Sequence, residues 1–365
     1  MTAPRQKPTG YLPGLDLLRI IASVFVVYLH ARDWYVSGQH EISGVDEVAR
    51  ATLFEPFHIS GPIGFIALGP FFLISGIVVT QAALKESVPQ FLGRRGIRIM
   101  PALWVLVLAS WLMVLAEWLP VEGGRGELDL PALLANLTFV NFFDTSPSVA
   151  TVAWTLVVQI PFYFFVAFTI PLLRRWPWLP PAIGIALVSV LLTIVNTEQT
   201  PAMHTSRVII GFAPALFIGQ LIGLVRAERL HPVAAVGYGV IQFLLFVRGD
   251  LTSEHTPPFD GYPRALVLTL LMVLIFAAID GPALRGKWIP WTAKRTYAMY
   301  LVHIPAMYVP PKLLGVANGS LVAILVGLVA LVVLTELLYR YVEAPIARWY
   351  RNREKAHQAK AAVAR

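Results

Sequence analysis

Two ionisable side chains lie inside the first long apolar stretch of this sequence. Residues 15–34 read LDLLRIIASVFVVYLHARDW and contain Arg19 and His30, with ten residues between them. On a helix this spacing is close to three turns, so the two side chains point in nearly the same direction, about 16 Å apart along the axis. An ionisable group inside an apolar helix normally faces a polar cavity or a partner. The pair therefore predicts a polar track along one face of this helix.

His30 has the chemistry of a general base. A neutral imidazole can take the proton from a hydroxyl that attacks a carbonyl, or can itself become a transient acyl carrier. The alternative is a histidine that only satisfies a buried carbonyl group. Asp33 lies three residues later on the same helical face and is the local candidate for an acid that orients the ring, although it could equally pair with Arg32. Asp16 is expected to neutralise Arg19.

Three further arginines lie at the start of another apolar stretch. Residues 91–104 read FLGRRGIRIMPALW and contain Arg94, Arg95 and Arg98. Guanidinium groups bind phosphate through paired donors, and the low dielectric at headgroup depth strengthens the attraction. Pairing with lipid phosphates is the alternative; we favour it for Arg95 and favour a ligand phosphate for Arg98. Arg295, before a later apolar stretch, is a weaker candidate of the same kind.

The composition is that of a membrane protein. Of 365 residues, 57% are hydrophobic and only 14% are charged, less charge than a soluble domain carries. The absence of cysteine excludes disulfides, thiolate metal ligands and a cysteine nucleophile, and we predict no metal. A nucleic-acid partner is also excluded, since the net charge of +8 is not gathered on a soluble domain with a recognition motif.

Ten apolar stretches predict membrane-spanning helices. They are residues 15–34, 62–84, 97–118, 152–173, 181–196, 207–225, 232–247, 264–280, 296–314 and 319–342. Basic residues concentrate in alternate connections, which predicts that both termini are cytoplasmic. Residues 130–143 are apolar but too short to cross, and predict an interfacial or re-entrant piece. We divide the chain into an all-α, polytopic membrane domain at 1–348 and a basic cytoplasmic tail at 349–365.

Several motifs, in this order, resemble the acyltransferase-3 family of bacterial integral membrane acyltransferases. After the arginine and histidine of the first stretch come FFLISG at 71–76, RxxR with a following IxP at 95–101, WTLVVQIPFY at 154–163, YAMYLVHIP at 297–305 and VEAP at 342–345. The resemblance covers nearly the whole chain. It implies about ten transmembrane helices around a central acyl-CoA tunnel in the bacterial plasma membrane. It further implies transfer of an acyl group, expected to be acetyl, from cytosolic acyl-CoA to a hydroxyl of a sugar, envelope glycoconjugate or glycolipid.

The resemblance also implies a catalytic role for His30 and a donor-binding role for the arginines of the first and third stretches. The physical arguments agree with this assignment. Coenzyme A carries its phosphates on a long flexible arm, so arginines at the cytoplasmic side can hold the phosphates while the thioester passes between helices. The axial separation of about 16 Å between Arg19 and His30 is comparable to the reach of that arm.

The sequence departs from the family pattern at Gln159, where many relatives have a glutamate. An amide can donate or accept a hydrogen bond, but it does not stabilise an imidazolium as a carboxylate does. Either Gln159 binds the acceptor, or another acid serves His30. His303 is expected to line the donor tunnel or to brace the helix distortion at Pro305.

Other polar residues are expected to have structural roles. Glu336 lies within the last apolar stretch and requires a partner, Glu343 lies in the VEAP turn near Arg340, and Ser75 is expected to pack helices together. Three aromatic residues are expected to pack, or to anchor helices at the membrane interface, rather than to bind substrate: Trp154, Tyr163 and Tyr300.

Two other classes of protein share some of these features. A transporter or flippase for a sugar or glycolipid also carries charges and broken helices within the membrane, but it predicts inverted internal repeats, which the sequence does not show. A channel or scaffold without chemistry would leave the arginines and His30 unexplained. The enzyme is therefore the favoured interpretation, with membrane lipids as its surroundings and acyl-CoA and a glycan as its partners.

Overall fold

The computed structural model describes residues 11–37, 44–121, 126–195, 200–252, 261–317 and 320–363. Within these ranges the regular secondary structure is helical and contains no strand, which confirms the all-α prediction. Each of the ten predicted stretches coincides with a helix: α1 (Pro13–Ser37), α3 (Ile63–Ala83), α4 (Val88–Leu115), α6 (Trp154–Arg175), α7 (Leu179–Ile194), α8 (Pro201–Arg226), α9 (Pro232–Thr252), α10 (Tyr262–Ala278), α13 (Thr296–Leu313) and α14 (Leu321–Leu338).

The lengths of these helices support a polytopic membrane protein. Seven of the described helical segments are long and apolar enough to cross a membrane, and α7 and α10 are shorter apolar helices. The α13 helix contains three prolines, Pro305, Pro310 and Pro311. Prolines are tolerated in a membrane helix where neighbouring helices cover the affected backbone. The count of ten crossings stays a prediction.

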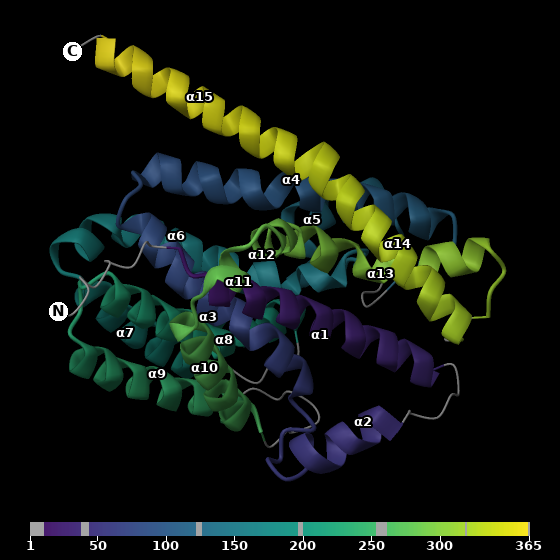
Figure 1. The fold of residues 1–365 in the computed structure, drawn as a ribbon, viewed down its shortest axis with the longest axis horizontal. Helices are drawn as coiled ribbons and strands as arrows, with labels where there is room; N and C mark the ends of the chain where they lie inside the picture. Colours follow the sequence, from purple (N-terminus) through teal and green to yellow (C-terminus); the bar gives the residue numbers. More distant parts are fainter. Residues whose placement is uncertain are drawn as a thin grey trace.

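Close contact between α3 and α8 forms the centre of the bundle (Figure 1). A Cβ atom at Gly76 would lie 2.2 Å from the carbonyl oxygen of Leu216, and one at Gly219 would lie 2.2 Å from that of Leu73. The two backbones therefore touch at positions where only glycine fits, which is the usual way that membrane helices approach closely.

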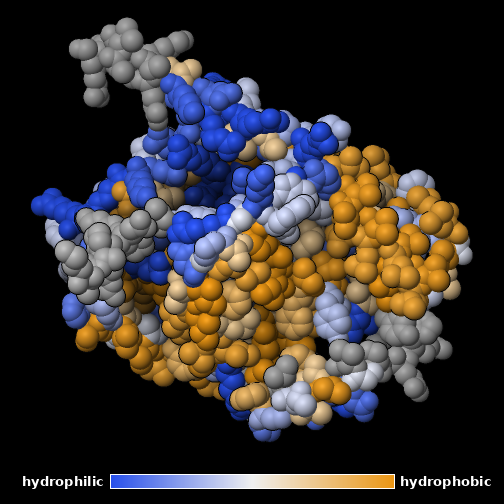
Figure 2. Space-filling view, in the orientation of Figure 1, coloured by the Kyte–Doolittle hydropathy of each residue, from blue (hydrophilic) through white to orange (hydrophobic). Residues whose placement is uncertain are grey.

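At one end of the bundle, which we call the basic end, arginine side chains form hydrogen bonds with backbone carbonyl groups at the ends of neighbouring helices. Here lie the links between α3 and α4, α6 and α7, α8 and α9, and α10 and α13. Arg174 donates to the carbonyl oxygen of Ala83 at 2.8 Å, Arg229 donates to that of Arg174, and Arg226 to that of Ala277 at 3.4 Å. Figure 2 shows hydrophilic side chains in the upper left of the view, around a hollow. Hydrophobic side chains cover much of the right and lower parts of the same face.

Short helices fill the connections. They are α2 (Gly44–Ala49), α5 (Leu130–Thr138), α11 (Pro282–Arg285) and α12 (Trp288–Ala293), with a π-helical turn at Arg50–Phe54 and 3₁₀ turns at Val140–Phe142 and Thr151–Ala153. The apolar piece predicted at 130–143 is α5 and the turn that follows it. Asp129 caps α5 by accepting from the backbone N–H of Ala132 at 2.9 Å, and Phe139 ends it in a left-handed conformation, φ 66°.

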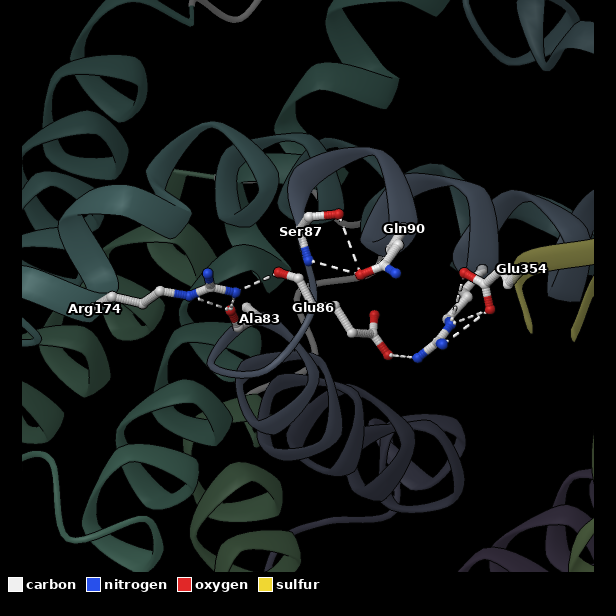
Figure 3. A network of polar contacts seen from close by, with 7 residues as sticks. Ala83, Glu86, Ser87, Gln90, Arg174 and Glu354 are labelled. Carbon is white, nitrogen blue, oxygen red and sulfur yellow. Dashed lines mark hydrogen bonds and ion pairs between the residues drawn. The ribbon is translucent and has the colours of Figure 1, made fainter. Parts of the chain in front are cut away.

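The end of α14 continues through a π-helical turn (Tyr339–Glu343) into α15 (Ala344–Val363). The α15 helix therefore passes through the predicted boundary at residue 348, and Figure 1 shows it running along the outside of α4. Glu354 of α15 accepts from Arg94 of α4 at 2.9 and 3.0 Å, and Arg94 also donates to Glu86 at 2.7 Å. Figure 3 shows this network, in which Glu354 and Glu86 approach from opposite sides.

Candidate functional site

A cavity of about 110 Å³ lies between α1, α3, α4, α6 and α13. Aliphatic and phenylalanine side chains form part of its wall, and the rest is polar. The charged and polar lining residues are Arg19, Ser75, Arg95, Arg98, Thr155, Gln159, Tyr163, Thr296, Tyr297 and Tyr300. This is the arrangement of a small-molecule site, with an apolar wall and a few convergent polar groups.

Three arginines from two helices meet at this cavity. Arg19 of α1 pairs with Asp16 at 3.4 Å, one turn earlier on the same helix, as predicted. Arg95 and Arg98 of α4 take part in no ion pair among the described residues, and the buried Nε of Arg95 has no hydrogen-bond partner there. Arg98 is exposed and lies close enough to Arg19 and Arg95 for the positive charges to repel one another. The cluster is therefore suited to bind an anion.

Gln159 forms hydrogen bonds with several uncharged groups around the cavity. Its Oε1 accepts from Ser75 Oγ at 2.7 Å and from Tyr163 Oη at 2.9 Å, and its Nε2 donates to the carbonyl oxygen of Thr155 at 3.2 Å. Both acceptor positions of the amide oxygen are thus filled by hydroxyl donors from α3 and α6. Gln159 lines the same cavity as Arg19, Arg95 and Arg98.

The two histidines lie behind one wall of the cavity. The ring of Tyr300, which lines the cavity, has its centroid 5.7 Å from that of His303, and His303 in turn lies 5.0 Å from His30. His303 is fully buried, whereas His30 is exposed. The cavity wall, as described, includes neither histidine, so the continuous tunnel stays a prediction.

The hydrogen bond of His303 fixes its tautomer. Nδ1 lies 2.6 Å from the carbonyl oxygen of Tyr300, and since a carbonyl only accepts, Nδ1 carries the proton. The Nε2 lone pair is then free to accept, and this buried atom has no partner among the described residues. The ring of His30 is a neighbour of this imidazole, with the two ring centroids 5.0 Å apart.

Three predicted site residues lie away from this cavity. Arg94 is held by the carboxylates of Glu354 and Glu86. Arg295 donates to Glu336 at 2.6 and 3.1 Å, which provides the partner that the position of Glu336 required. Asp33 lies 3.1 Å from Arg32, and 68% of its side chain is exposed, which is the alternative partnership considered from the sequence.

Four residues with expected structural roles lie at or near the site instead. Ser75 of α3, Tyr163 of α6 and Tyr300 of α13 line the cavity. Glu343, in the π-helical turn, has a buried oxygen without a hydrogen-bond partner among the described residues. The positive charge of Arg98 lies near enough to attract its carboxylate. The VEAP motif drew attention to Glu343 in the sequence, but it did not predict that Arg98 would be the neighbouring charge.

Comparison with known proteins gives the following matches. The sequence model of a family described as an acyltransferase domain matches residues 12–340. The peptidoglycan O-acetyltransferase OatA of Listeria monocytogenes is 24% identical over 377 residues, which cover 93% of this chain and 56% of that protein. The O-acetyltransferase OatA of Staphylococcus aureus is 22% identical over 379 residues, covering 93% of this chain and 57% of that protein. This chain thus spans about half the length of these relatives. No solved structure matches it.

Proposed function

This chain belongs to the acyltransferase-3 family, and from that membership we propose that it is a membrane O-acyltransferase. It would transfer an acyl group, with acetyl expected, from acyl-CoA to a hydroxyl of a cell-envelope glycan. The name of the Listeria monocytogenes relative, a peptidoglycan O-acetyltransferase, supports a peptidoglycan-type acceptor. The observation that carries the proposal is the arginine-lined cavity, whose far wall leads through Tyr300 to two adjoining histidines.

The donor would bind at the arginines. Arg98, which is exposed, and Arg95, whose Nε lacks a partner among the described residues, would hold the phosphates of acyl-CoA through charge-assisted hydrogen bonds. Arg19 would contribute a third positive charge, partly compensated by Asp16. The thioester end would enter between Gln159 and Tyr300.

The transfer step would use His30 as the general base. As the acceptor oxygen attacks the thioester carbonyl carbon, its proton passes to His30. The new carbon–oxygen bond forms, the carbon–sulfur bond breaks, and the protonated His30 gives its proton to the departing thiolate, which leaves as the coenzyme A thiol. His303 would position His30 rather than react, since its Nε2 can accept an N–H from that ring and so select the tautomer.

Two variants separate donor binding from transfer in purified protein. Acetyl-CoA should raise the unfolding temperature of the wild type in lipid nanodiscs, as any ligand of the folded state does. Arg98→Ala should abolish this increase, whereas the control Arg175→Ala, an exposed arginine that stacks on Trp176, should keep it. His30→Ala should keep the increase and lose release of coenzyme A thiol in the presence of a glycan acceptor.

The control for His30→Ala is His231→Ala, an exposed histidine at the link between α8 and α9. It should transfer at the wild-type rate. Full turnover by His30→Ala would refute the assignment of the base, and equal stabilisation of Arg98→Ala by acetyl-CoA would refute the donor site.

The proposed orientation places the basic end in the cytoplasm of a bacterium, where acyl-CoA is available. Because the chain contains no cysteine, single cysteines can be introduced for accessibility labelling in whole cells. Glu127→Cys, beyond the end of α4, should react with a membrane-impermeant maleimide, and Ala283→Cys, in α11, should react only after lysis. The opposite pattern would reverse the orientation.

A further inference from the structure

A second cavity lies at the end of the bundle opposite the basic end. It has a volume of about 550 Å³ and lies between the last residues of α4 and the second half of α13. Its polar and aromatic lining consists of Glu117, Trp118, Tyr308 and Lys312, and the remainder is aliphatic or proline. The proposed donor site and transfer step leave this cavity without a role.

Tyr308 connects the second cavity with the histidine pair. Its ring centroid lies 5.1 Å from that of Trp34, and Trp34 is four residues after His30, one turn further along the same face of α1. On α13, Tyr308 is five residues beyond His303, about 7.5 Å along the axis. The cavity therefore begins roughly one turn beyond the histidines, on the side away from the arginines.

The lining has the chemistry that binds a sugar ring. Trp118 is 41% exposed, so its ring is available to a ligand, and an electron-rich aromatic face attracts the C–H groups on the flat side of a pyranose. Lys312 Nζ donates to the backbone carbonyl of Glu117, which holds the residues before Trp118 against α13. The carboxylate of Glu117 lies on an exposed residue and can accept from sugar hydroxyls.

We propose that this cavity is a saccharide subsite, which binds a ring of the glycan acceptor next to the ring whose hydroxyl reacts at His30. The inference rests on the proposed function and adds a place for the acceptor. Binding of a neighbouring ring supplies energy far from the reacting atoms, which can be used to orient the reacting hydroxyl. An oligosaccharide should therefore be a better ligand and a better acceptor than a single sugar.

Binding of chitotetraose, a soluble β-1,4-linked tetramer of N-acetylglucosamine, tests the subsite. The measurement is titration calorimetry of the protein in nanodiscs without acyl-CoA, with N-acetylglucosamine as the monomer control. Wild type should bind the tetramer more tightly than the monomer. Trp118→Ala should weaken tetramer binding about two- to tenfold, the value of one aromatic contact, and Trp118→Phe should restore most of it.

Trp178→Ala is the matched control, because Trp178 is 49% exposed and lies at the basic end, in the link between α6 and α7. It should bind the tetramer like the wild type. The proposal is overturned if chitotetraose does not bind, if Trp118→Ala binds it unchanged, or if both tryptophan variants weaken binding equally.

The failure of this inference differs from the failure of the proposed function. Tetramer binding by His30→Ala, without thiol release by the wild type, would support the subsite and refute the transferase. Thiol release that is independent of acceptor length and of Trp118 would support the transferase and refute the subsite.

Discussion

The glycine contact between α3 and α8 gives the sharpest structural prediction. In Gly219→Ala the new Cβ would lie 2.2 Å from the carbonyl oxygen of Leu73 and 2.9 Å from the Cα of Gly76. Backbone atoms form this contact, so no flexible side chain can move aside, and the helices must separate by about 1 Å to reach normal contact distances. Overpacking of this kind costs about 1–3 kcal/mol. We expect the unfolding temperature to fall by several degrees.

Gly211→Ala, in the same helix α8, is the matched control. A Cβ at Gly211 meets no atom within 4 Å, and alanine is favoured over glycine inside a helix by about 1 kcal/mol. This variant should therefore unfold at or above the wild-type temperature. Thermal unfolding in nanodiscs, followed by tryptophan fluorescence, compares the two. If Gly219→Ala is as stable as Gly211→Ala, the backbones are not in the contact described.

A glycine-to-alanine substitution on the α3 side of this contact, at Gly76, should also affect the cavity. Gly76 adjoins Ser75, whose Oγ lies 2.7 Å from Gln159 Oε1. A displacement of α3 by about 1 Å would take these atoms beyond hydrogen-bond distance. Gly76→Ala should therefore weaken stabilisation by acetyl-CoA as well as lower the unfolding temperature, whereas Gly64→Ala, on the same helix with open space around it, should do neither.

Three further predictions follow from individual contacts. Arg295→Lys should lower the unfolding temperature, because a lysine cannot reproduce the two hydrogen bonds to Glu336, and acetyl-CoA binding should not change. Gln159→Glu should raise the KM for acetyl-CoA, since it adds a negative charge to the cavity that the arginines line; an unchanged KM would place the donor phosphates elsewhere. Hydrogen bonds from Arg285 lower the pKa of Asp280, so this pair stabilises the fold above the ordinary carboxyl pKa and its contribution is lost as the pH falls through the lowered pKa. The difference in unfolding temperature between wild type and Asp280→Asn should therefore shrink at acid pH.

The positions of the helices could be predicted from the sequence because burial in a membrane is a local requirement. Each of the ten apolar stretches forms a helix, although α4 begins at Val88 rather than at 97. The basic segment before Arg98 was assigned to a connection, but it continues the helix because Ser87 and Gln90 form a capping box that starts α4 earlier.

Partners of the charged residues could not be predicted in the same way. Arg94 and Arg98 lie four residues apart in the same basic segment, yet Arg94 is bound by Glu354, which is 260 positions away, and Arg98 lines the cavity. Asp33 was the acid nearest to His30 in sequence, but in the structure the ring of His303, on α13, lies against the ring of His30. Such pairings depend on which helices pack side by side.

The sequence alone determined that this protein is an all-α membrane protein of the acyltransferase-3 family, because hydrophobicity and motifs are properties of short segments. Only the tertiary structure decided that Arg19, Arg95 and Arg98 share a cavity with Gln159 and that His303 joins His30. The physical reason is that a polar group inside an apolar bundle must find its partner in space, and the partner's position follows from the packing of helices that are distant in sequence.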